Sequence, residues 1–279
     1  MNELIGKQIG QYQVILLIRK TPVSVIYRAF DVKLNRIIAL EIILPGTSYV
    51  ELLFNPIKEY TIQLSKLTHP YICALLDCNI YEGLLCLAFD FSPTRIFKLP
   101  FNNPISYEEA FQKLIPIIQA LAYAHSKQMI HGAVNFSNIL IDDKGNLCLF
   151  DFGINEVIHR ELCKLTPGEK ISTAFGYSPP EQYSGETVNE QTDIYSLGMV
   201  IYHLITGHRL YQDDKPLKEI IKQNKSVKVG INLHDKYIPK TVTYFLQRCL
   251  AYNPATRFNS MQEVFLIASK ITLNHRISR

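Results

Sequence analysis

The ten residues at positions 131–140, which read HGAVNFSNIL, decide the fold of this chain. Further along stands Asp151-Phe152-Gly153, directly after an apolar run with the composition of a short buried strand. Three more motifs follow in order: GYSPPEQY at 176–183, TDIYSLG at 192–198 and NPATRF at 253–258. Each motif alone is a weak signal, so their order and spacing carry the information.

In this order and spacing the motifs resemble those of the protein kinases, in the form found in bacterial Ser/Thr kinases. The catalytic loop of that family reads H-R-D-x-K-x-x-N and its metal-binding motif reads D-F-G. The resemblance implies an α+β, two-lobed fold, with a small antiparallel β lobe carrying one helix and a larger, mainly helical lobe. It implies a single domain over residues 1–279, with an N-lobe at 1–89, a hinge at 90–93 and a C-lobe at 94–279.

The hydrophobic pattern predicts the same organisation. Short β-rich runs occur at 12–18, 24–30, 37–44, 74–79 and 84–89, and a helical stretch covers about 54–67. Beyond residue 93 the pattern becomes helical, and capping boxes that begin at Ser106 and Ser260 open two helices. We therefore expect a five-stranded sheet with one helix, followed by a helical region, with no second domain.

The composition is that of a folded domain. Of the 279 residues, 47% are hydrophobic and 19% are charged, which excludes a disordered chain. The net charge of +4 is scattered, so neither a nucleic acid nor a membrane is predicted as a partner. The six cysteines form no C-x-x-C pair, and no apolar leader follows the charged start. The sequence thus predicts buried free thiols in a cytoplasmic protein.

Compared with the family motif, the catalytic loop of this chain lacks residues that take part in phosphoryl transfer. Ala133 stands where the family has the aspartate that accepts the proton of the substrate hydroxyl, and Asn135 stands where it has a lysine. Ala174 aligns with the threonine that supports this aspartate from the activation segment. The resemblance therefore implies that the base and its orienting partner are both absent.

The glycine-rich loop that covers the phosphates in a kinase is also replaced. Its three glycine positions hold Arg19, Thr21 and Ser24. Residues without a Cβ allow backbone N–H groups to approach the phosphate oxygens closely, and these three residues do not. A rival interpretation is that Lys20 or Arg19 reaches the phosphates in place of a lysine that is missing elsewhere.

That lysine belongs to the third strand, where this chain has Glu41. At ~4 Å and an effective dielectric of ~20, two unit charges interact by ~4 kcal/mol, so the charge reversal opposes ATP. The glutamate of the N-lobe helix, which normally pairs with the lysine, is replaced by Tyr60, or by Glu59 if the alignment is shifted by one residue. We expect Glu41 to face an open cleft, so that its replacement by alanine leaves stability unchanged.

Two metal-binding positions of the family survive as Asn138 and Asp151. Either they hold magnesium, a hard cation that prefers oxygen ligands, or they hydrogen-bond local backbone and persist as determinants of the fold. The resemblance also implies residues that would enclose a nucleotide, namely Ile26, Ala39, Phe89, Asp90, Phe91 and Leu140. Because the phosphate side is altered, Mg-ATP would bind weakly.

The other surviving residues support the fold. Asp193 resembles the central-helix aspartate that accepts hydrogen bonds from the catalytic-loop backbone, and His131 and Phe152 resemble residues that stack between the lobes. Glu181 and Arg257 resemble a buried ion pair in which each charge satisfies the other, so removing either partner would be strongly destabilising.

These substitutions identify the chain as a degenerate member of the family, a pseudokinase. We expect it to transfer no phosphate and to act on another protein as a binding or allosteric module. Two alternatives stay open. One is an atypical Ser/Thr kinase with residual transfer from Mg-ATP, and the other is a nucleotide-binding switch without chemistry.

Overall fold

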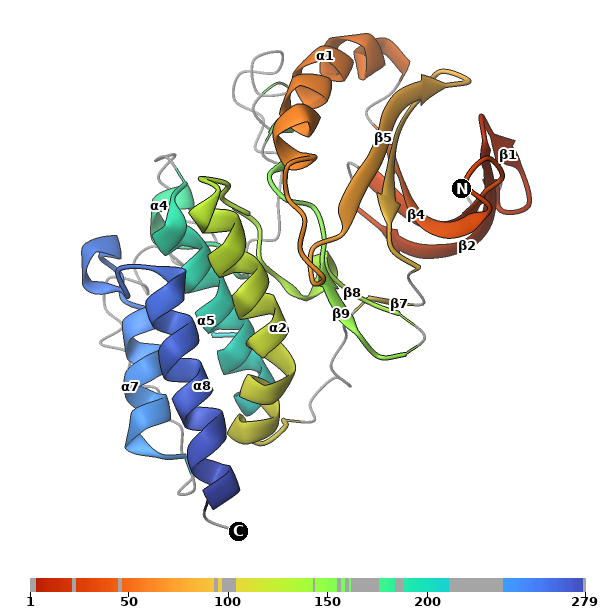
Figure 1. Ribbon diagram of the computed structural model, residues 1–279. Helices are drawn as coiled ribbons and strands as arrows, with labels where there is room; N and C mark the ends of the chain where they lie inside the picture. The colour runs from red at the N-terminus through yellow and green to blue at the C-terminus, as the bar shows by residue number, and fades with distance from the viewer. Residues whose placement is uncertain are drawn as a thin grey trace. The chain divides into compact units, whose positions relative to one another are not determined.

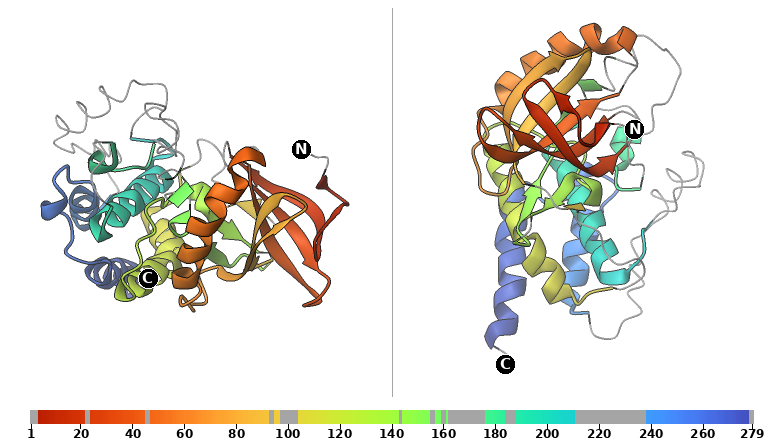
Figure 2. Two further views of the ribbon diagram at one scale, coloured as in Figure 1. Left: turned by 90° about the horizontal axis from the view of Figure 1, so that it is seen from above. Right: turned by 90° about the vertical axis from the view of Figure 1, so that its right-hand side faces the viewer.

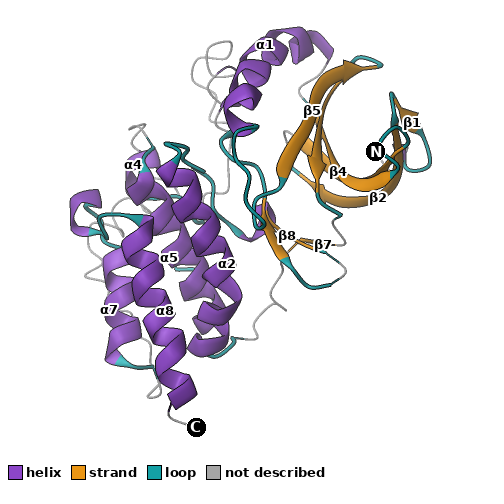
Figure 3. Cartoon of the chain, viewed as in Figure 1, coloured by secondary structure: helices purple, strands orange, loops and turns teal. Residues whose placement is uncertain are grey.

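The computed structural model describes residues 4–21, 24–44, 47–92, 95–96, 104–142, 144–154, 157–158, 161, 176–183, 188–210 and 238–277 (Figures 1 and 3). The chain divides into two compact units. The first comprises Met1–Phe97 and Ser137–Ile171, and the second comprises Lys98–Phe136 and Ser172–Arg279. Residues 137–171, which the sequence places in the C-lobe, thus belong with the N-terminal part of the chain. The predicted hinge begins at the end of a strand, and its residue 93 lies outside the described residues.

A curled antiparallel sheet forms the body of the first unit (Figure 1). The strand order is β1-β2-β3-β4-β6-β5. The strands are β1 (Gln8–Ile9), β2 (Tyr12–Lys20), β3 (Ser24–Asp31), β4 (Arg36–Ile43), β5 (Ala74–Tyr81) and β6 (Leu84–Asp90). The five predicted runs are therefore all strands, and β1 is an addition. At two residues it is too short to show an alternating pattern.

The two faces of this sheet differ in chemistry, because successive side chains of a strand point to opposite sides. One face carries the apolar core, which includes Val14 of β2, Tyr27 of β3 and Leu40 of β4. On β4, the side chains that alternate with this core include those of Ala39 and Glu41, and both are buried. The second face is thus covered as well, and it carries a charged group.

One helix, α1 (Thr47–Leu64), packs against β5 and β6. It begins several residues before the predicted start at about residue 54. A second, three-stranded sheet, with the order β7-β8-β9, consists of β7 (Arg95–Ile96), β8 (Ile139–Ile141) and β9 (Leu147–Leu149). An isolated bridge between Ile72 and Leu149 ties β9 to the segment before β5. The bridge thereby holds β9, and the residues that directly follow it, within the first unit.

The second unit is helical. Its helices are α2 (Tyr107–Ser126), α4 (Pro180–Tyr183), α5 (Glu190–Thr206), α7 (Lys240–Cys249) and α8 (Met261–Ile277), with a 3-10 turn at η3 (Pro254–Thr256). Helices α2, α5 and α8 pack against one another (Figure 2). The predicted cap of α2 is present, since the Ser106 hydroxyl accepts a hydrogen bond from the Glu109 amide at 3.2 Å. Gly207 ends α5 at φ 74°, which favours glycine.

Among the described residues, no helix has the length and apolarity needed to cross a membrane. The described residues also contain no group of three or more His, Cys, Asp or Glu side chains that could hold a metal ion. Five of the cysteines are buried free thiols, and Cys163 lies outside the described residues.

Candidate functional site

A row of four paired residues crosses the sheet of the first unit. It contains Glu41, the acidic residue at the position of the family's lysine. Arg19 of β2 pairs with Ile26 of β3, Ile26 pairs with Glu41 of β4, and Glu41 pairs with Leu87 of β6. Directly paired residues project from the same face of a sheet. Arg19 and Glu41 therefore lie on one face, separated by one strand. We refer to these four residues as the Glu41 row.

Two register shifts in β2 bring Arg19 into this row, the first between Val14 and Leu16 and the second between Leu17 and Arg19. Leu17 pairs with Tyr27 on the core face, and the register then shifts by one residue at Ile18, as in a β-bulge. Because of this shift, Arg19 rather than Ile18 stands opposite Ile26. Lys20 pairs with Val25 and is exposed. Of the two cations that the sequence offered, the structure thus directs Arg19 to the site and Lys20 to solvent.

The guanidinium of Arg19 binds two surviving residues of the metal-binding motifs. Its Nη1 donates to the backbone oxygen of Ser137 at 2.8 Å and to the side-chain oxygen of Asn138. Its Nη2 lies 3.9 Å from Oδ2 of Asp151. The guanidinium also lies 6.0 Å from the ring centre of Phe150, within the range of a cation–π contact. Arg19 is only 7% exposed, so these contacts are shielded from water.

Asn138 and Asp151 are brought together by the local backbone. Asn138 ends the 3-10 turn η2 (Phe136–Asn138), directly before β8, and Asp151 follows closely after β9. The amide of Phe150 donates to the Asn138 carbonyl at 2.8 Å, which fixes the start of one strand beside the end of the other. Asp151 has a φ of 67°, a left-handed conformation that aspartate tolerates better than most residues.

Glu41 is buried, and the expectation that it faces an open cleft is wrong. It is 1% exposed, and its Oε2 has no hydrogen-bond partner among the described residues. Burial raises the pKa of the Glu41 carboxyl, while the positive charge of Arg19 and a hydrogen bond from Ser24 offset part of that rise. The physical reason is that the residue has a cation on its own sheet, which the sequence could not place.

The residues expected to enclose an adenine are packed rather than open. Ile26, Ala39 and Leu140 are each 0% exposed. Phe89, at 1% exposure, packs against Phe150 with ring centres 4.5 Å apart.

The two predicted hinge residues next to Phe89 serve local structure. Asp90 is exposed and forms an ion pair with Arg36 at 2.9 Å. The amide of Phe91 donates to the carbonyl of Phe89 at 2.9 Å, so it is already engaged within the chain.

Tyr60, at the position of the helix glutamate, contacts the Asp-Phe-Gly motif. A Cβ atom on Gly153 would come within 2.0 Å of the Tyr60 hydroxyl, so the phenol lies against the Gly153 backbone. Glu59, the alternative, is exposed. In the first unit, the residue at the position of the helix glutamate therefore contacts the Asp-Phe-Gly motif through a phenol.

The turn that replaces the glycine-rich loop is tied by its first and last residues. The amide of Thr21 donates to the Ser24 carbonyl at 2.8 Å, and the amide of Ser24 donates to the Thr21 hydroxyl at 2.9 Å. The two residues between them lie outside the described residues. The Ser24 amide, at a glycine position of the family, thus already has an acceptor within the chain.

In the second unit, Asp193 of α5 organises the catalytic-loop backbone. Its two carboxylate oxygens accept from the amides of His131 and Gly132, each at 2.8 Å, and Oδ2 also lies 2.8 Å from Nε2 of the buried His125. The loop therefore keeps the backbone support that the resemblance implies. The side-chain amide of Asn135 donates through Nδ2 to the Ala133 carbonyl at 2.9 Å. His131 is 0% exposed, and Ala174 lies outside the described residues.

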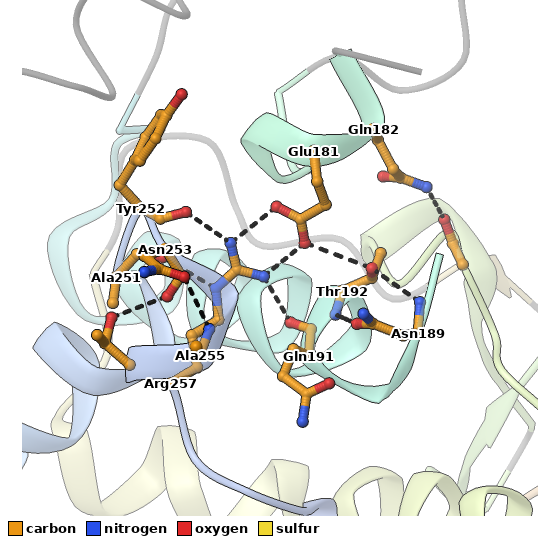
Figure 4. Close-up of polar contacts among 12 residues, drawn as sticks. Glu181, Gln182, Asn189, Gln191, Thr192, Ala251, Tyr252, Asn253, Ala255 and Arg257 are labelled. Atoms are coloured by element: carbon orange, nitrogen blue, oxygen red, sulfur yellow. Dashed lines mark hydrogen bonds and ion pairs between the residues drawn. The ribbon is translucent and has the colours of Figure 1, made fainter. Parts of the chain in front are cut away.

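Glu181 of α4 and Arg257 form the buried pair expected from the sequence (Figure 4). Nη1 and Nη2 of the arginine donate to the two carboxylate oxygens at 2.6 and 2.8 Å. The remaining donors reach the backbone carbonyls of Gln191, Ala251 and Tyr252. All five N–H groups of the guanidinium thus have acceptors, which makes burial of this charge tolerable.

Comparison with known proteins agrees with this arrangement. The family model described as "Protein kinase domain" matches residues 20–266. The chain belongs to the protein kinase family. It is 25% identical over 264 residues to "Serine/threonine-protein kinase PrkC" of Bacillus subtilis, an alignment that covers 94% of this chain and 40% of the relative. It is 24% identical over 259 residues to "Carbon catabolite-derepressing protein kinase" of Candida glabrata, covering 91% of this chain and 40% of that relative. The chain thus spans about two fifths of the length of these relatives.

Solved structures show the same fold. The crystal structure of the Mycobacterium tuberculosis PknI kinase domain superposes with a TM-score of 0.70 at 21% identity, covering 95% of this chain and 98% of that domain. The predicted kinase-like fold, with a curled antiparallel sheet and a helical part, is confirmed.

Protein kinases use Mg-ATP, and the positions of Asn138 and Asp151 are those that hold the metal. Magnesium requires near-octahedral oxygen ligands at about 2.0–2.1 Å. In this member of the family, an Arg19 N–H group occupies the Asn138 oxygen, and the same guanidinium lies beside Asp151. The residues present do not fit a magnesium ion in this arrangement.

From the sequence, Arg19 is predicted as a replaced glycine and, in the rival interpretation, as a phosphate ligand, but not as a partner of Asn138 and Asp151. A signal was present in β2, whose buried Tyr12 and Val14 begin a strict alternation that Leu16 and Leu17 break. A broken alternation indicates a bulge, and a bulge changes which face the following residue takes.

Proposed function

We propose that this protein kinase-family domain is impaired in phosphoryl transfer and acts by binding another protein, as a regulatory or allosteric module. The observation that carries the proposal is Ala133, a methyl group at the position of the family's catalytic acid. Loss of a general base lowers a rate by about 10²–10⁴, and loss of an electrostatic clamp lowers it by about a further 10²–10³.

The phosphate side of the site supports the same proposal. Glu41 brings a buried carboxylate where kinases have a lysine, and Arg19 binds the oxygen atoms that would hold a metal. Meanwhile the contacts that hold the fold are retained, namely the Asp193 hydrogen bonds and the Glu181–Arg257 pair. A domain that keeps its scaffold and loses its chemistry is suited to recognition.

The experiment is a single-turnover assay with labelled ATP and either Mg²⁺ or Mn²⁺, with Asp151→Asn as the matched control. We expect transfer below about 10⁻² s⁻¹, against a family range of about 1–100 s⁻¹, and no difference between the native chain and the control. Autophosphorylation that Asp151→Asn abolishes would instead establish residual kinase activity.

A nucleotide-binding switch without chemistry is the second candidate, and it is favoured by one observation, the presence of Arg19 on the phosphate side of the site. Melting curves with ATP, ADP and adenosine separate it from the first candidate. A large stabilisation by ATP without transfer would establish the switch. No response to any nucleotide would support a protein-binding module. The partner, its substrates if any, and the predicted cytoplasmic location belong to the proposal.

A further inference from the structure

Arg19 of the first unit lies on a sheet face with one acidic side chain and contacts two further side chains through their oxygen atoms. Arg19 shares a sheet face with Glu41 through the Glu41 row, and it contacts Asn138 and Asp151 directly. All are withdrawn from water, with Arg19 at 7%, Asn138 at 3%, and Glu41 and Asp151 at 1% exposure.

Buried carboxylates require a cation nearby, because an unpaired charge in the interior costs several kcal/mol. The guanidinium contacts one carboxylate and one amide oxygen, and such oxygen atoms are the donors that a hard divalent cation prefers. Arg19 reaches both Asn138 and Asp151 with a positive charge. It comes from the chain itself, so it is present at an effective concentration that no free ion matches.

We propose that Arg19 is a built-in substitute for the metal ion: its guanidinium holds Asn138 and Asp151, the native domain binds no divalent cation there, and a neutral residue at position 19 creates a divalent-cation site. The inference rests on the proposed function of an impaired kinase-family domain and specifies how its metal site is occupied. A guanidinium that contacts both side chains opposes a divalent cation at the same oxygens, because two positive charges would then lie close together in a buried site.

The test compares the native chain with Arg19→Met, which keeps similar length and removes the charge. Melting temperatures are measured in MgCl₂, MnCl₂ or CaCl₂ at about 5 mM, against NaCl of equal ionic strength. We expect no metal-specific shift for the native chain. Arg19→Met should melt at a lower temperature without metal and recover about 3 °C or more with Mn²⁺ or Mg²⁺. Adding Asp151→Asn to Arg19→Met should abolish that recovery, which places the ion at this carboxylate.

A measurement on the native chain keeps the proposal falsifiable if Arg19→Met does not fold. Electron paramagnetic resonance of Mn²⁺ counts bound ions directly, and we expect no site with a dissociation constant below about 100 µM. A native site of that affinity, lost in Asp151→Asn, would overturn the proposal. So would a folded Arg19→Met that shows no metal response. Because the readout is metal binding and not phosphoryl transfer, tight native Mn²⁺ binding without transfer would refute this inference and leave the proposed function standing.

Discussion

The phenol of Tyr60 lies against the backbone of Gly153, so that α1 touches the Asp-Phe-Gly motif at its glycine. Gly153 has a φ of 63°, and any Cβ placed there would overlap the Tyr60 hydroxyl. The contact replaces the ion pair that this helix would otherwise offer. It makes the conformation of the motif depend on the packing of one aromatic side chain.

Gly153→Ala is therefore expected to destabilise the fold more than an ordinary glycine replacement. Gly145→Ala is the matched control, because Gly145 has a φ of 83° with nothing within 4 Å of its Cβ position. Both variants should lose about 1–2 kcal/mol from the left-handed backbone, and Gly153→Ala about 1–3 kcal/mol more from overlap. Urea denaturation measures the difference, and Tyr60→Leu should reduce it. Equal losses in the two glycine variants would show that the phenol moves aside freely.

The Glu181–Arg257 pair predicts a large loss of stability when either partner is removed. Arg257→Ala and Glu181→Ala should each cost about 3–5 kcal/mol, because each leaves a buried charge without its partner. Lys113→Ala, which removes an exposed ion pair with Glu109 at 3.5 Å, should cost about 0.5 kcal/mol or less. Chemical denaturation of the three variants tests the contrast. Similar midpoints for all three would mean that the pair does not hold the fold.

The shared face of Arg19 and Glu41 predicts that their substitutions are coupled. Arg19→Met leaves Glu41 without its cation, so adding Glu41→Gln should cost less than the two single changes predict, by about 0.5–3 kcal/mol. Lys20→Met is the matched control, because Lys20 pairs with Val25 and is exposed. A double-mutant cycle in urea gives both coupling energies. Additive behaviour of Arg19 with Glu41 would contradict the arrangement.

The half-buried His203 predicts a loss of stability in mild acid. Burial lowers its pKa to about 4, aided by the positive charges of Arg209 and His208, and its Nδ1 lies 2.7 Å from the Tyr177 hydroxyl. The folded state thus favours the neutral ring. Its contribution is complete above the ordinary histidine pKa of about 6.5 and is lost as the pH falls from there toward 4.

Allowing for the partial exposure of His203, this loss amounts to about 1 kcal/mol. His203→Asn keeps an acceptor near Tyr177 and does not titrate, so its unfolding free energy should fall less between pH 7 and pH 4.5. Parallel curves for the native chain and the variant would assign the acid sensitivity to other groups.

The fold could be predicted from the sequence because its signals are local. Alternating apolar residues define the strands, and the Ser106 cap and the motifs around Asp151 and Asp193 each occupy a few adjacent positions. The two members of the Glu181–Arg257 pair were likewise recognisable, since each stands in its own short motif.

The contacts of Arg19 and the burial of Glu41 could not be predicted, because they depend on residues that lie far apart in the sequence. Arg19 and Asn138 are 119 positions apart, and Arg19 reaches its place in the sheet through two register shifts of β2, between Val14 and Leu16 and at Ile18. The burial of Glu41 depends on the same shifts, since a carboxylate without a cation on its own face would favour an exposed position. Sequence patterns report which residues are present, whereas the direction of a side chain after a bulge is decided by the packing of the whole sheet.

The shift at Ile18 also restricts how the strand can pair. Regular pairing beyond Leu17 would place Arg19 opposite Val25, which belongs to the apolar core of the sheet. In that alignment Arg19 would take the place that the exposed Lys20 has in the observed register, and Asn138 and Asp151 would lose their contacts with the guanidinium, so the competing alignment is disfavoured. The same arginine that neutralises the acids thereby selects a single alignment of β2 and β3 during folding. A strand with an apolar residue at this position would have two alignments of similar free energy, and the chain would lose conformational uniqueness before it lost stability.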